Sequence, residues 1–208
     1  MSSPIINRWH DKMSEKKDIY TFKVAICGDG AVGKTSLINR FVEGTFTREY
    51  LVTLGVEITK YGREVRGDEV NLIFWDLAGQ DQFSKVRQRF FSGTSAAILV
   101  FSHEQNEEGE KSFQHLQKWL DHIRENCGDI PIILFGNKID LIDEDLQFDE
   151  KYPKSDVKLK KLASDLGLLD YFKTSALTGE GVMSSFRVLT FELHKKSKER
   201  ANHSNIDS

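Results

Sequence analysis

The sequence predicts an α/β fold in which helices cover both faces of a mostly parallel β-sheet. Apolar strand-like runs alternate with helix-like runs between residues 20 and 195. Two strand-like runs flank a turn at residues 66–68, which indicates an antiparallel pair within the sheet. A glycine-rich segment, Gly28–Thr35, follows the first strand-like run and precedes the first helix-like run, as a phosphate-binding loop does.

The composition is that of an ordinary globular chain. Its 208 residues suit one domain, with 39% hydrophobic residues, 29% charged residues and a net charge of −3. Without a basic excess, the chain has no electrostatic signature of nucleic-acid binding. No apolar run reaches the ~20 residues of a membrane-spanning helix, and no signal peptide is recognisable. Two cysteines, Cys27 and Cys127, are expected as free thiols in a cytosolic protein.

The first half of the chain contains the phosphate-loop unit and the hairpin. Residues 22–27 form an apolar run that predicts a strand, and a helix is expected from the loop to about residue 43. Residues 44–55 show no regular pattern and are expected to be irregular. Residues 55–63 and 69–76 read as the two strands of the hairpin.

The second half continues the alternation. Unbroken apolar runs predict buried strands, and apolar residues at helical spacing predict helices. The expected strands are 96–102, 130–136 and 171–174, and the expected helices are 111–125, 157–166 and 182–195. Ligands of such sheets bind at the carboxyl ends of the strands, where every motif described below is found.

The remaining segments are polar. Residues 1–19 are expected to be a flexible or short helical leader, in which apolar residues at i, i+4 spacing could contact a membrane or a partner. Residues 103–110 and 141–156 are acidic and read as surface loops. The tail, 196–208, is expected to be disordered.

The segment Gly28–Thr35 fits the pattern G-x-x-x-x-G-K-[ST]. Its glycines let backbone N–H groups turn toward phosphate oxygens, and the following helix N-terminus adds partial positive charge. Lys34 is expected to reach the β- and γ-phosphates, and the Thr35 hydroxyl to bind Mg²⁺. The alternative is a glycine-rich turn into a helix with no ligand.

Two further features belong to phosphate and metal chemistry. Asp76 ends a strand and can hold Mg²⁺ through a water. Gly79 can offer its N–H to a γ-phosphate, and Gln80 can orient a water for attack. Thr53 can join the metal shell when a γ-phosphate draws its loop inward. Read without a ligand, the same residues are a strand-ending aspartate, a glycine turn and a loop threonine.

A base-selecting element follows a buried strand at Asn137-Lys138-Ile139-Asp140. The Asp140 carboxylate can accept hydrogen bonds from the N1–H and the 2-amino group of guanine, a donor pair that adenine lacks. The Lys138 stem can pack along the base. Ala176, in Ser175-Ala176-Leu177 after the short strand, can donate its N–H to the guanine carbonyl oxygen. Asn137 and Asp140 could instead be simple loop caps.

The ordered set GDGAVGKT, Thr53, DLAGQ, NKID and SAL resembles the small GTPases of the Ras superfamily. Trp75, the TLGVE segment and Trp119 resemble the Rab branch most. The resemblance implies a P-loop NTPase G domain over residues 20–195, with a six-stranded mostly parallel sheet containing one antiparallel strand, and five helices on both faces. It also implies GTP or GDP as ligand, Mg²⁺ as cofactor, and two switch regions at 44–55 and 77–92.

The resemblance and the motifs together assign the site residues. Those assigned to catalysis are Gln80, Lys34 and Gly79. Those assigned to Mg²⁺ are Thr35, Thr53 and Asp76. Those assigned to nucleotide binding are Gly28, Asp29, Gly30, Ala31, Val32, Gly33, Lys34, Thr35, Ser36, Phe46, Tyr50, Thr53, Gly79, Asn137, Lys138, Asp140, Ser175, Ala176 and Leu177. Phe46 would cover the guanine edge.

The sequence also departs from the Rab pattern. Rab proteins usually end in prenylated cysteines, whereas the last cysteine here is Cys127, so C-terminal prenylation is not expected. Ile58 stands where Rab proteins usually carry an aromatic residue that contacts effectors. A cytoplasmic location is therefore expected, with membrane contact left to residues 1–18.

The resulting hypothesis is a slow GTP-hydrolysing switch whose two switch regions bind effectors, exchange factors and GTPase-activating proteins. A GTP-binding scaffold that does not hydrolyse its nucleotide uses the same site and is the alternative. An ATP-dependent kinase or ATPase would share only the phosphate loop, and Asp140 opposes it.

Overall fold

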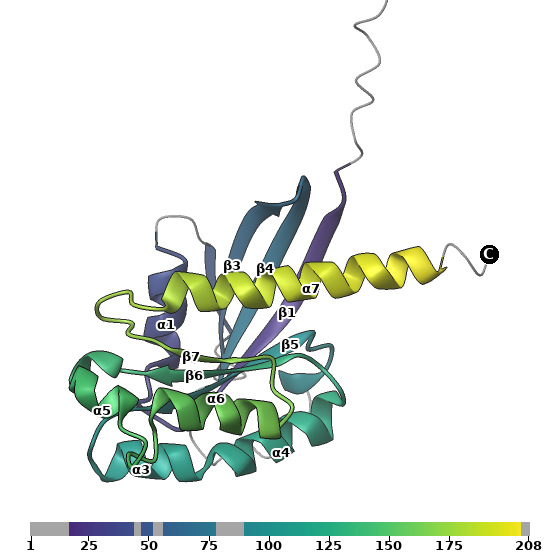
Figure 1. The fold of residues 1–208 in the computed structure, drawn as a ribbon. Helices are drawn as coiled ribbons and strands as arrows, with labels where there is room; N and C mark the ends of the chain where they lie inside the picture. Colours follow the sequence, from purple (N-terminus) through teal and green to yellow (C-terminus); the bar gives the residue numbers. More distant parts are fainter. Residues whose placement is uncertain (1–16, 44–46, 52–55, 78–89, 205–208) are drawn as a thin grey trace, which may run out of the picture.

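A β-sheet separates two layers of helices in the computed structural model of this chain (Figure 1). The structure describes residues 17–43, 47–51, 56–77 and 90–204. The sheet has seven strands in the order β2-β3-β4-β1-β5-β6-β7. The predicted α/β class is therefore confirmed.

Most of the strands run parallel. The first strand, β1 (Ile19–Cys27), lies between β4 (Asp68–Leu77) and β5 (Ala96–Ser102) and is parallel to both. Beyond β5, the sheet continues through β6 (Ile132–Asn137) and β7 (Tyr171–Lys173), again in parallel. The carboxyl ends of β1, β5, β6 and β7 consequently meet at one edge of the sheet.

One strand, β3 (Val56–Val65), runs antiparallel to both of its neighbours, β4 and β2 (Thr47–Leu51). Arg66 and Gly67 join β3 to β4, and both have positive φ, as a tight two-residue hairpin turn requires. The predicted antiparallel strand is thus confirmed. The strand β2 adds to the six that were predicted and lies within the stretch 44–55 that was expected to be irregular. Its sequence, TREYL, has little apolar content, so only its backbone pairing with β3 reveals it.

The helices divide between the two faces of the sheet (Figure 1). One face carries α1 (Lys34–Phe41) and α7 (Val182–Ser204). The other carries α3 (Glu107–Gln114), α4 (Leu116–Cys127) and α6 (Asp156–Asp165). This two-sided covering buries β5 at every position, as the unbroken apolar run predicts.

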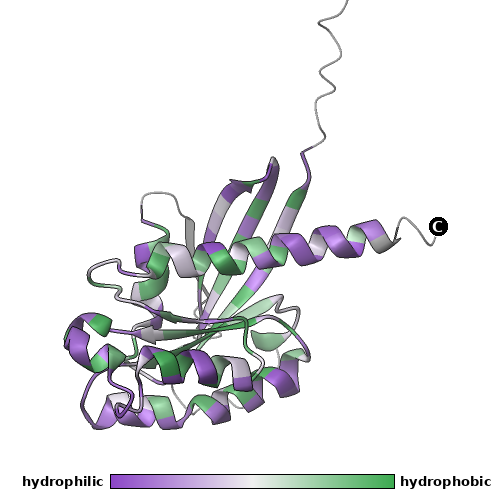
Figure 2. Ribbon diagram, in the orientation of Figure 1, coloured by the Kyte–Doolittle hydropathy of each residue, from purple (hydrophilic) through white to green (hydrophobic). Residues whose placement is uncertain are grey.

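The alternation of side chains along β1 builds both cores. Val24 and Ile26 face the α1–α7 layer, while Ala25 and Cys27 face the α4–α6 layer. Phe41 of α1 and Phe186 of α7 stack with ring centroids 4.2 Å apart. Figure 2 shows the apolar centre of the sheet and the polar outer part of α7. Each face therefore has its own hydrophobic cluster, with the sheet between them.

The helix predicted at 111–125 is divided in the structure. Its N-terminal part, α3, begins at Glu107, where the Asn106 side chain accepts a hydrogen bond from Gly109 N at 2.8 Å. The second part, α4, follows after His115. The helical spacing indicated the helix correctly, but the cap at Asn106 starts it earlier than the apolar pattern does.

The two acidic segments are not simple surface loops. Between residues 141 and 156, a short helix, α5 (Glu144–Phe148), forms, and Lys154 and Ser155 are buried. In the segment 103–110, His103 is 1% exposed and Nε2 lies 3.0 Å from the Tyr171 hydroxyl. Burial, with Lys154 and Lys173 nearby, lowers the pKa of His103 to about 3. The polar composition of these two segments gave no sign that some of their residues are buried.

The last helix is longer than predicted. It extends past residue 195 to Ser204, through most of the tail that was expected to be disordered. Residues 1–16 and 205–208 lie outside the described part of the chain, so the predictions for them stay predictions. None of the helices among the described residues combines the length and apolar character of a membrane span.

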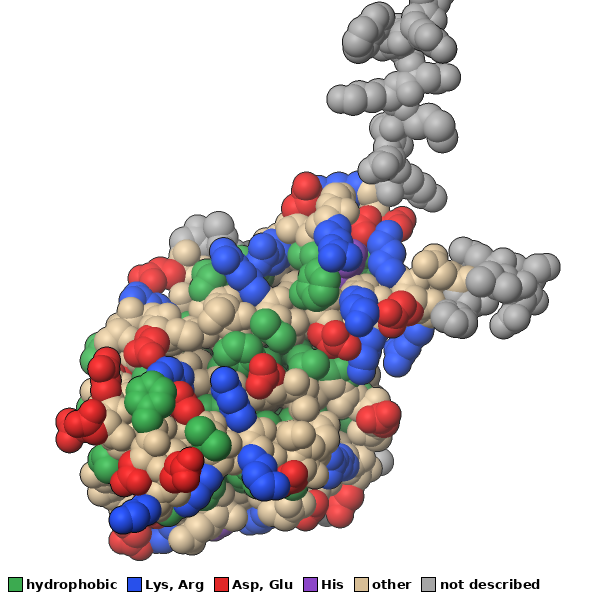
Figure 3. Space-filling model, viewed as in Figure 1, with side chains coloured by type: hydrophobic (Ala, Val, Ile, Leu, Met, Phe, Trp, Pro, Cys, Tyr) green, Lys and Arg blue, Asp and Glu red, His purple; other side chains and the backbone are tan. Residues whose placement is uncertain are grey.

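A hydrogen bond and an ion pair hold the C-terminal half of α7 against the sheet. His194 Nε2 and Lys198 Nζ lie 2.7 Å and 2.9 Å from the buried Asp68 carboxylate, at the start of β4. Their hydrogen bonds lower the pKa of Asp68 to about 2. In Figure 3, lysine and arginine side chains gather over this end of α7. The extension beyond residue 195 is thus anchored through Lys198 to carboxylates that are distant in the sequence.

Candidate functional site

The predicted motifs meet at the carboxyl edge of the sheet. The segment Gly28–Thr35 joins β1 to α1, the segment after Asn137 follows β6, and the segment after Lys173 follows β7. Because these strands are neighbours or share β5 as a neighbour, their connections converge on one site. One half of the site is built on the glycine-rich loop, and the other half on the segments after β6 and β7.

Two glycines of the loop are required by close contacts. At Gly28, φ is +144° and a Cβ would overlap the backbone oxygen of Val100. At Gly33, φ is +94° and a Cβ would overlap the Asn137 side chain. L-residues rarely adopt such φ values. Gly33 therefore allows the two halves of the site to touch.

Lys34 lies inside the loop. It is 6% exposed, and its Nζ donates to the backbone oxygens of Gly28 and Asp29 at 3.0 Å and 2.7 Å. Burial lowers the pKa of Lys34, and the nearby Asp76 carboxylate partly opposes this effect. The ammonium thus lies against loop carbonyls, where the oxygens of a bound phosphate would give it stronger, charged acceptors.

Thr35 and Asp76 form a small oxygen cluster beside the loop. The Thr35 hydroxyl donates to Asp76 Oδ2, while the buried Oδ1 of Asp76 has no hydrogen-bond partner among the described residues. Burial raises the pKa of Asp76 more than the contacts with Thr35 and Lys34 lower it. An unsatisfied carboxylate oxygen beside a hydroxyl fits a hard cation such as Mg²⁺, which takes oxygen ligands and keeps several waters. Phosphate oxygens would complete such a set.

Asn137 joins the two halves of the site. Its Nδ2 donates to the backbone oxygen of Val32, in the loop, at 2.8 Å. Its Oδ1 accepts from the backbone N–H of Ala176, in the segment after β7, at 3.2 Å. The side chain is 1% exposed. A single buried amide therefore fixes three segments of the site relative to one another.

A pocket of about 450 Å³ lies beside Asn137. Its lining residues are Gly33, Ser36, Glu104, Asn137, Lys138, Asp140, Leu141, Ala176 and Leu177. Seven of these nine residues were assigned to the nucleotide from the sequence. Ser175 lies behind this wall, where its buried hydroxyl accepts from Thr178 N at 3.0 Å. A pocket with aliphatic walls and two carboxylates suits a planar base that carries hydrogen-bond donors.

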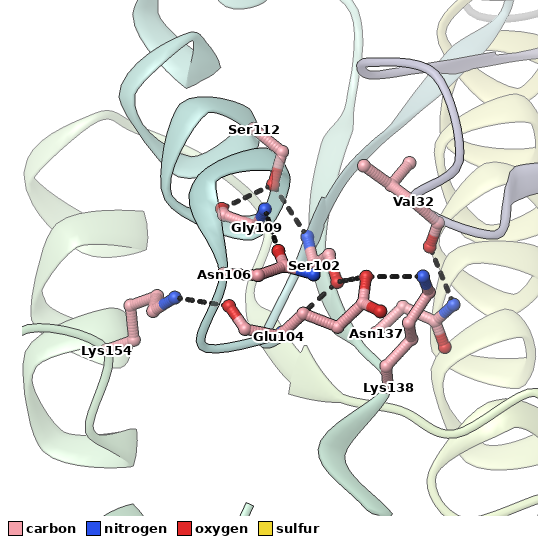
Figure 4. Close-up of polar contacts among 9 residues, drawn as sticks. All are labelled: Val32, Ser102, Glu104, Asn106, Gly109, Ser112, Asn137, Lys138 and Lys154. Carbon is pink, nitrogen blue, oxygen red and sulfur yellow. Dashed lines mark hydrogen bonds and ion pairs between the residues drawn. The ribbon is translucent and has the colours of Figure 1, made fainter. Parts of the chain in front are cut away.

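Glu104 was not predicted, and it lines the pocket. Its Oε2 accepts from Lys138 Nζ at 2.5 Å and from Ser102 Oγ at 3.0 Å (Figure 4). Its backbone oxygen lies 3.4 Å from Nζ of the buried Lys154. Glu104 follows two residues after the end of β5, at the same edge as the predicted motifs. That position was the signal in the sequence that could have identified it.

A second group that was not predicted holds the phosphate loop. The Asp29 carboxylate lies 2.7 Å from Nδ1 of His115 and 2.7 Å from Nε1 of Trp119. Trp119 was expected on the apolar side of its helix and was noted for the resemblance, and nothing in the sequence near His115 indicated this contact. The junction of α3 and α4 is thereby tied to the loop.

Several predicted residues cannot be located. Phe46, Thr53, Gly79 and Gln80 lie outside the described residues. Tyr50 lies on β2, where only the backbone is described. Most of the two expected switch regions, 44–55 and 77–92, also lies outside the described residues. Their assigned roles stay predictions.

Comparisons with known proteins agree with this arrangement. A family model described as "Ras family" matches residues 23–195. The GTP-binding protein yptV5 of Volvox carteri is 34% identical over 192 residues, which cover 90% of this chain and 88% of that protein. The Ras-related protein Rab-13 of Mesocricetus auratus is 33% identical over 91% of this chain and 89% of its own. The Ras-related protein RABA4b of Arabidopsis thaliana is 32% identical over 91% and 80%.

Proposed function

We infer the function of this chain from its family, because the chain belongs to the Ras family and is a Rab-like small GTPase. We propose that its own residues carry out a nucleotide-dependent switch in the following way. The chain hydrolyses GTP to GDP slowly with Mg²⁺, and residues 44–55 and 77–92 change conformation between the two nucleotide states. The observation that carries the proposal is the Asn137 amide, which joins the loop, the pocket and the segment after β7.

The base binds in the 450 Å³ pocket. Asp140 accepts from the N1–H and the 2-amino group of guanine, and Ala176 N donates to the base carbonyl oxygen. An adenine base would leave Asp140 without donors and would present its own amino group to Ala176 N. Unmatched polar groups of this kind reject the wrong base by orders of magnitude.

The phosphates bind in the glycine-rich loop. Lys34 moves from its carbonyl acceptors to the β- and γ-phosphate oxygens, and the loop N–H groups donate to the same oxygens. Thr35 and Asp76 would hold Mg²⁺, Asp76 through a water, and Thr53 would add its hydroxyl in the GTP-bound state. The metal supplies charge neutralisation for the phosphates.

Hydrolysis requires an aligned water. Gln80 orients it in line with the γ-phosphate, and Gly79 N donates to that phosphate. No arginine is assigned to the transition-state charge, so intrinsic turnover is slow and a partner protein is expected to accelerate it. In the alternative role, the chain would be a GTP-binding scaffold that binds the nucleotide in the same pocket but does not hydrolyse it. Gln80 would then position no water.

Single-turnover phosphate release from bound GTP tests the proposal. We expect Gln80→Leu to slow release by at least ~10-fold, the order expected for loss of a positioned catalytic group, with GTP affinity retained. Gln117→Leu, on the exposed surface of α4, is the matched control and should behave as the native chain. No turnover by the native chain would favour the scaffold, and tighter binding of ATP than GTP would contradict the base assignment.

Partners and location follow from the same premise. The two switch regions are proposed to bind effectors, exchange factors and GTPase-activating proteins in a Rab-like role in membrane trafficking. The location is proposed to be cytoplasmic, with residues 1–18 as the candidate membrane contact. Co-sedimentation with liposomes, with and without residues 1–18, tests that contact, and equal partitioning of the two chains would contradict it.

A further inference from the structure

Three charged side chains line the base pocket, and only two of them form an ion pair with each other. Two are the carboxylates of Glu104 and Asp140, and one is the ammonium of Lys138. The ammonium pairs with Glu104, with Nζ to Oε2 at 2.5 Å. Within the described part of the chain, the Asp140 carboxylate forms no hydrogen bond or ion pair. The structure thus leaves one carboxylate available to a ligand.

We propose that Glu104 is a specificity-determining positioning residue of the guanine site, which holds the Lys138 ammonium away from Asp140. This inference rests on the proposed function. Lys138 and Asp140 are two residues apart on the same pocket wall. If Glu104 were absent, the only other carboxylate in the pocket lining would be the one that the base requires.

Glu104 is placed firmly enough for this role. Its side chain is 26% exposed, and Ser102 Oγ donates to the same oxygen that accepts from Lys138. The hydrogen bond from Lys138 lowers the pKa of Glu104, so the carboxylate is ionised at neutral pH. Ser102 itself is fixed because its backbone N–H donates to Ser112 Oγ at 3.0 Å.

The backbone of Glu104 is contacted by Lys154, which is distant in the sequence, and by Gly109 of the neighbouring helix α3. Lys154, 1% exposed at its side chain, places its Nζ 3.4 Å from Glu104 O and 2.6 Å from Glu110 Oε1. Gly109 of α3 packs so closely that a Cβ there would overlap Glu104 O. Figure 4 shows Lys154 reaching Glu104 from one side and Gly109 lying above it. The two acidic segments therefore form the support of the base pocket.

This arrangement has a specific consequence for base choice. Guanine gives Asp140 two donors, while hypoxanthine, which lacks the 2-amino group, gives one. If Lys138 turned to Asp140, it would compete with both bases for the carboxylate. Because guanine would lose two hydrogen bonds to Asp140 and hypoxanthine only one, the preference for GDP over IDP would decrease.

The test measures dissociation of fluorescent GDP and IDP analogues from the full chain. We expect Glu104→Ala to release GDP about 10-fold faster, the scale of one charge-assisted hydrogen bond. We expect a smaller increase for IDP, so the GDP/IDP ratio falls. Glu104→Gln, which keeps an acceptor for Lys138, should restore part of both values. Glu108→Ala removes the same charge from the exposed surface of α3 and is the matched control.

The outcomes separate this inference from the proposed function. If the native chain binds neither nucleotide, the proposed function fails, and the inference fails with it. If the native chain prefers GDP and Glu104→Ala keeps the same ratio, the inference alone is contradicted, even if release of both nucleotides accelerates equally. Lys154→Met should lower the GDP/IDP ratio by a smaller factor, and an unchanged ratio would remove Lys154 from the support.

Discussion

The base half and the phosphate half of the site differ in how their polar groups are satisfied. On the base side, Asn137 bonds to Val32 and Ala176, and Lys138 pairs with Glu104. The contacts of Asn137 with Val32 and of Lys138 with Glu104 can persist when a nucleotide binds, whereas the Ala176 N–H would exchange Asn137 for the base carbonyl oxygen. On the phosphate side, Lys34 rests on loop carbonyls, and one oxygen of Asp76 has no partner among the described residues.

This difference indicates that the base half is largely preorganised, while the phosphate half exchanges most of its partners on binding. Preorganised groups affect the stability of the empty chain as well as its affinity. Groups that exchange partners affect mainly the affinity. The following changes test this contrast, from the largest expected effect to the smallest.

Replacing Asn137 with alanine should harm both stability and binding. It leaves Val32 O and Ala176 N without their partner, which costs about 1–3 kcal/mol for each buried group left unsatisfied. We expect a lower Tm of the nucleotide-free chain, and GDP affinity weaker by on the order of 100-fold. Differential scanning fluorimetry and titration with fluorescent GDP measure the two effects. An unchanged Tm would show that the base half is not preorganised.

Replacing Lys34 with methionine should separate the two properties. We expect GDP affinity to fall by at least ~10-fold, because charge-assisted bonds to the phosphates are lost. The Tm of the nucleotide-free chain should fall less than in Asn137→Ala, because a partly desolvated ammonium is removed. GMP, which lacks the outer phosphates, provides the control and should bind the variant as it binds the native chain. An equal loss for GMP would contradict the assigned contact.

Replacing Asp76 with asparagine should show a dependence on pH. Burial raises the pKa of Asp76 in the folded chain, so the folded state holds its proton more tightly than the unfolded state. Native stability therefore decreases as pH rises from the ordinary aspartate pKa of about 4 through the raised value. Asparagine does not ionise. As pH rises over that interval, we therefore expect the urea midpoint of the nucleotide-free variant to increase relative to that of the native chain.

The same variant should weaken the metal dependence of binding. If Asp76 holds a water of Mg²⁺, its loss should raise the Mg²⁺ concentration needed for GDP retention by about 10–100-fold. Titration of Mg²⁺ against GDP release measures this. A variant whose urea midpoints follow the native chain from pH 4 to pH 7 would contradict the role of burial at Asp76.

The smallest effect is expected at Trp119. Trp119→Phe keeps an aromatic ring but removes the N–H that donates to Asp29. We expect GDP release to accelerate by a few fold, because one bond of about 1 kcal/mol no longer restrains the loop. Trp75→Phe, on β4, is the matched control, since Trp75 contacts Lys23 and Phe90 rather than the loop. Identical release from both variants would show that the α4 contact does not restrain the phosphate half.

The sequence alone predicted features whose physical cause is local. The segment Gly28–Thr35 could be recognised because its backbone conformation, its strand and its helix all lie within a few residues of it. Asn137 and Asp140 were recognised because they lie at the end of an apolar run that predicts a buried strand. In each case, the residues that carry the chemistry are neighbours in the chain.

The tertiary structure decided which distant groups meet. Glu104 meets Lys138 across 34 positions and Lys154 across 50, and Asp29 meets Trp119 across 90. No periodicity connects such positions, because their contacts depend on the order of strands in the sheet and on where each helix ends. The sequence by itself therefore determined the class of fold and the kind of site. Only the packing of its loops determined that Lys138 is paired with Glu104 while Asp140 has no partner among the described residues.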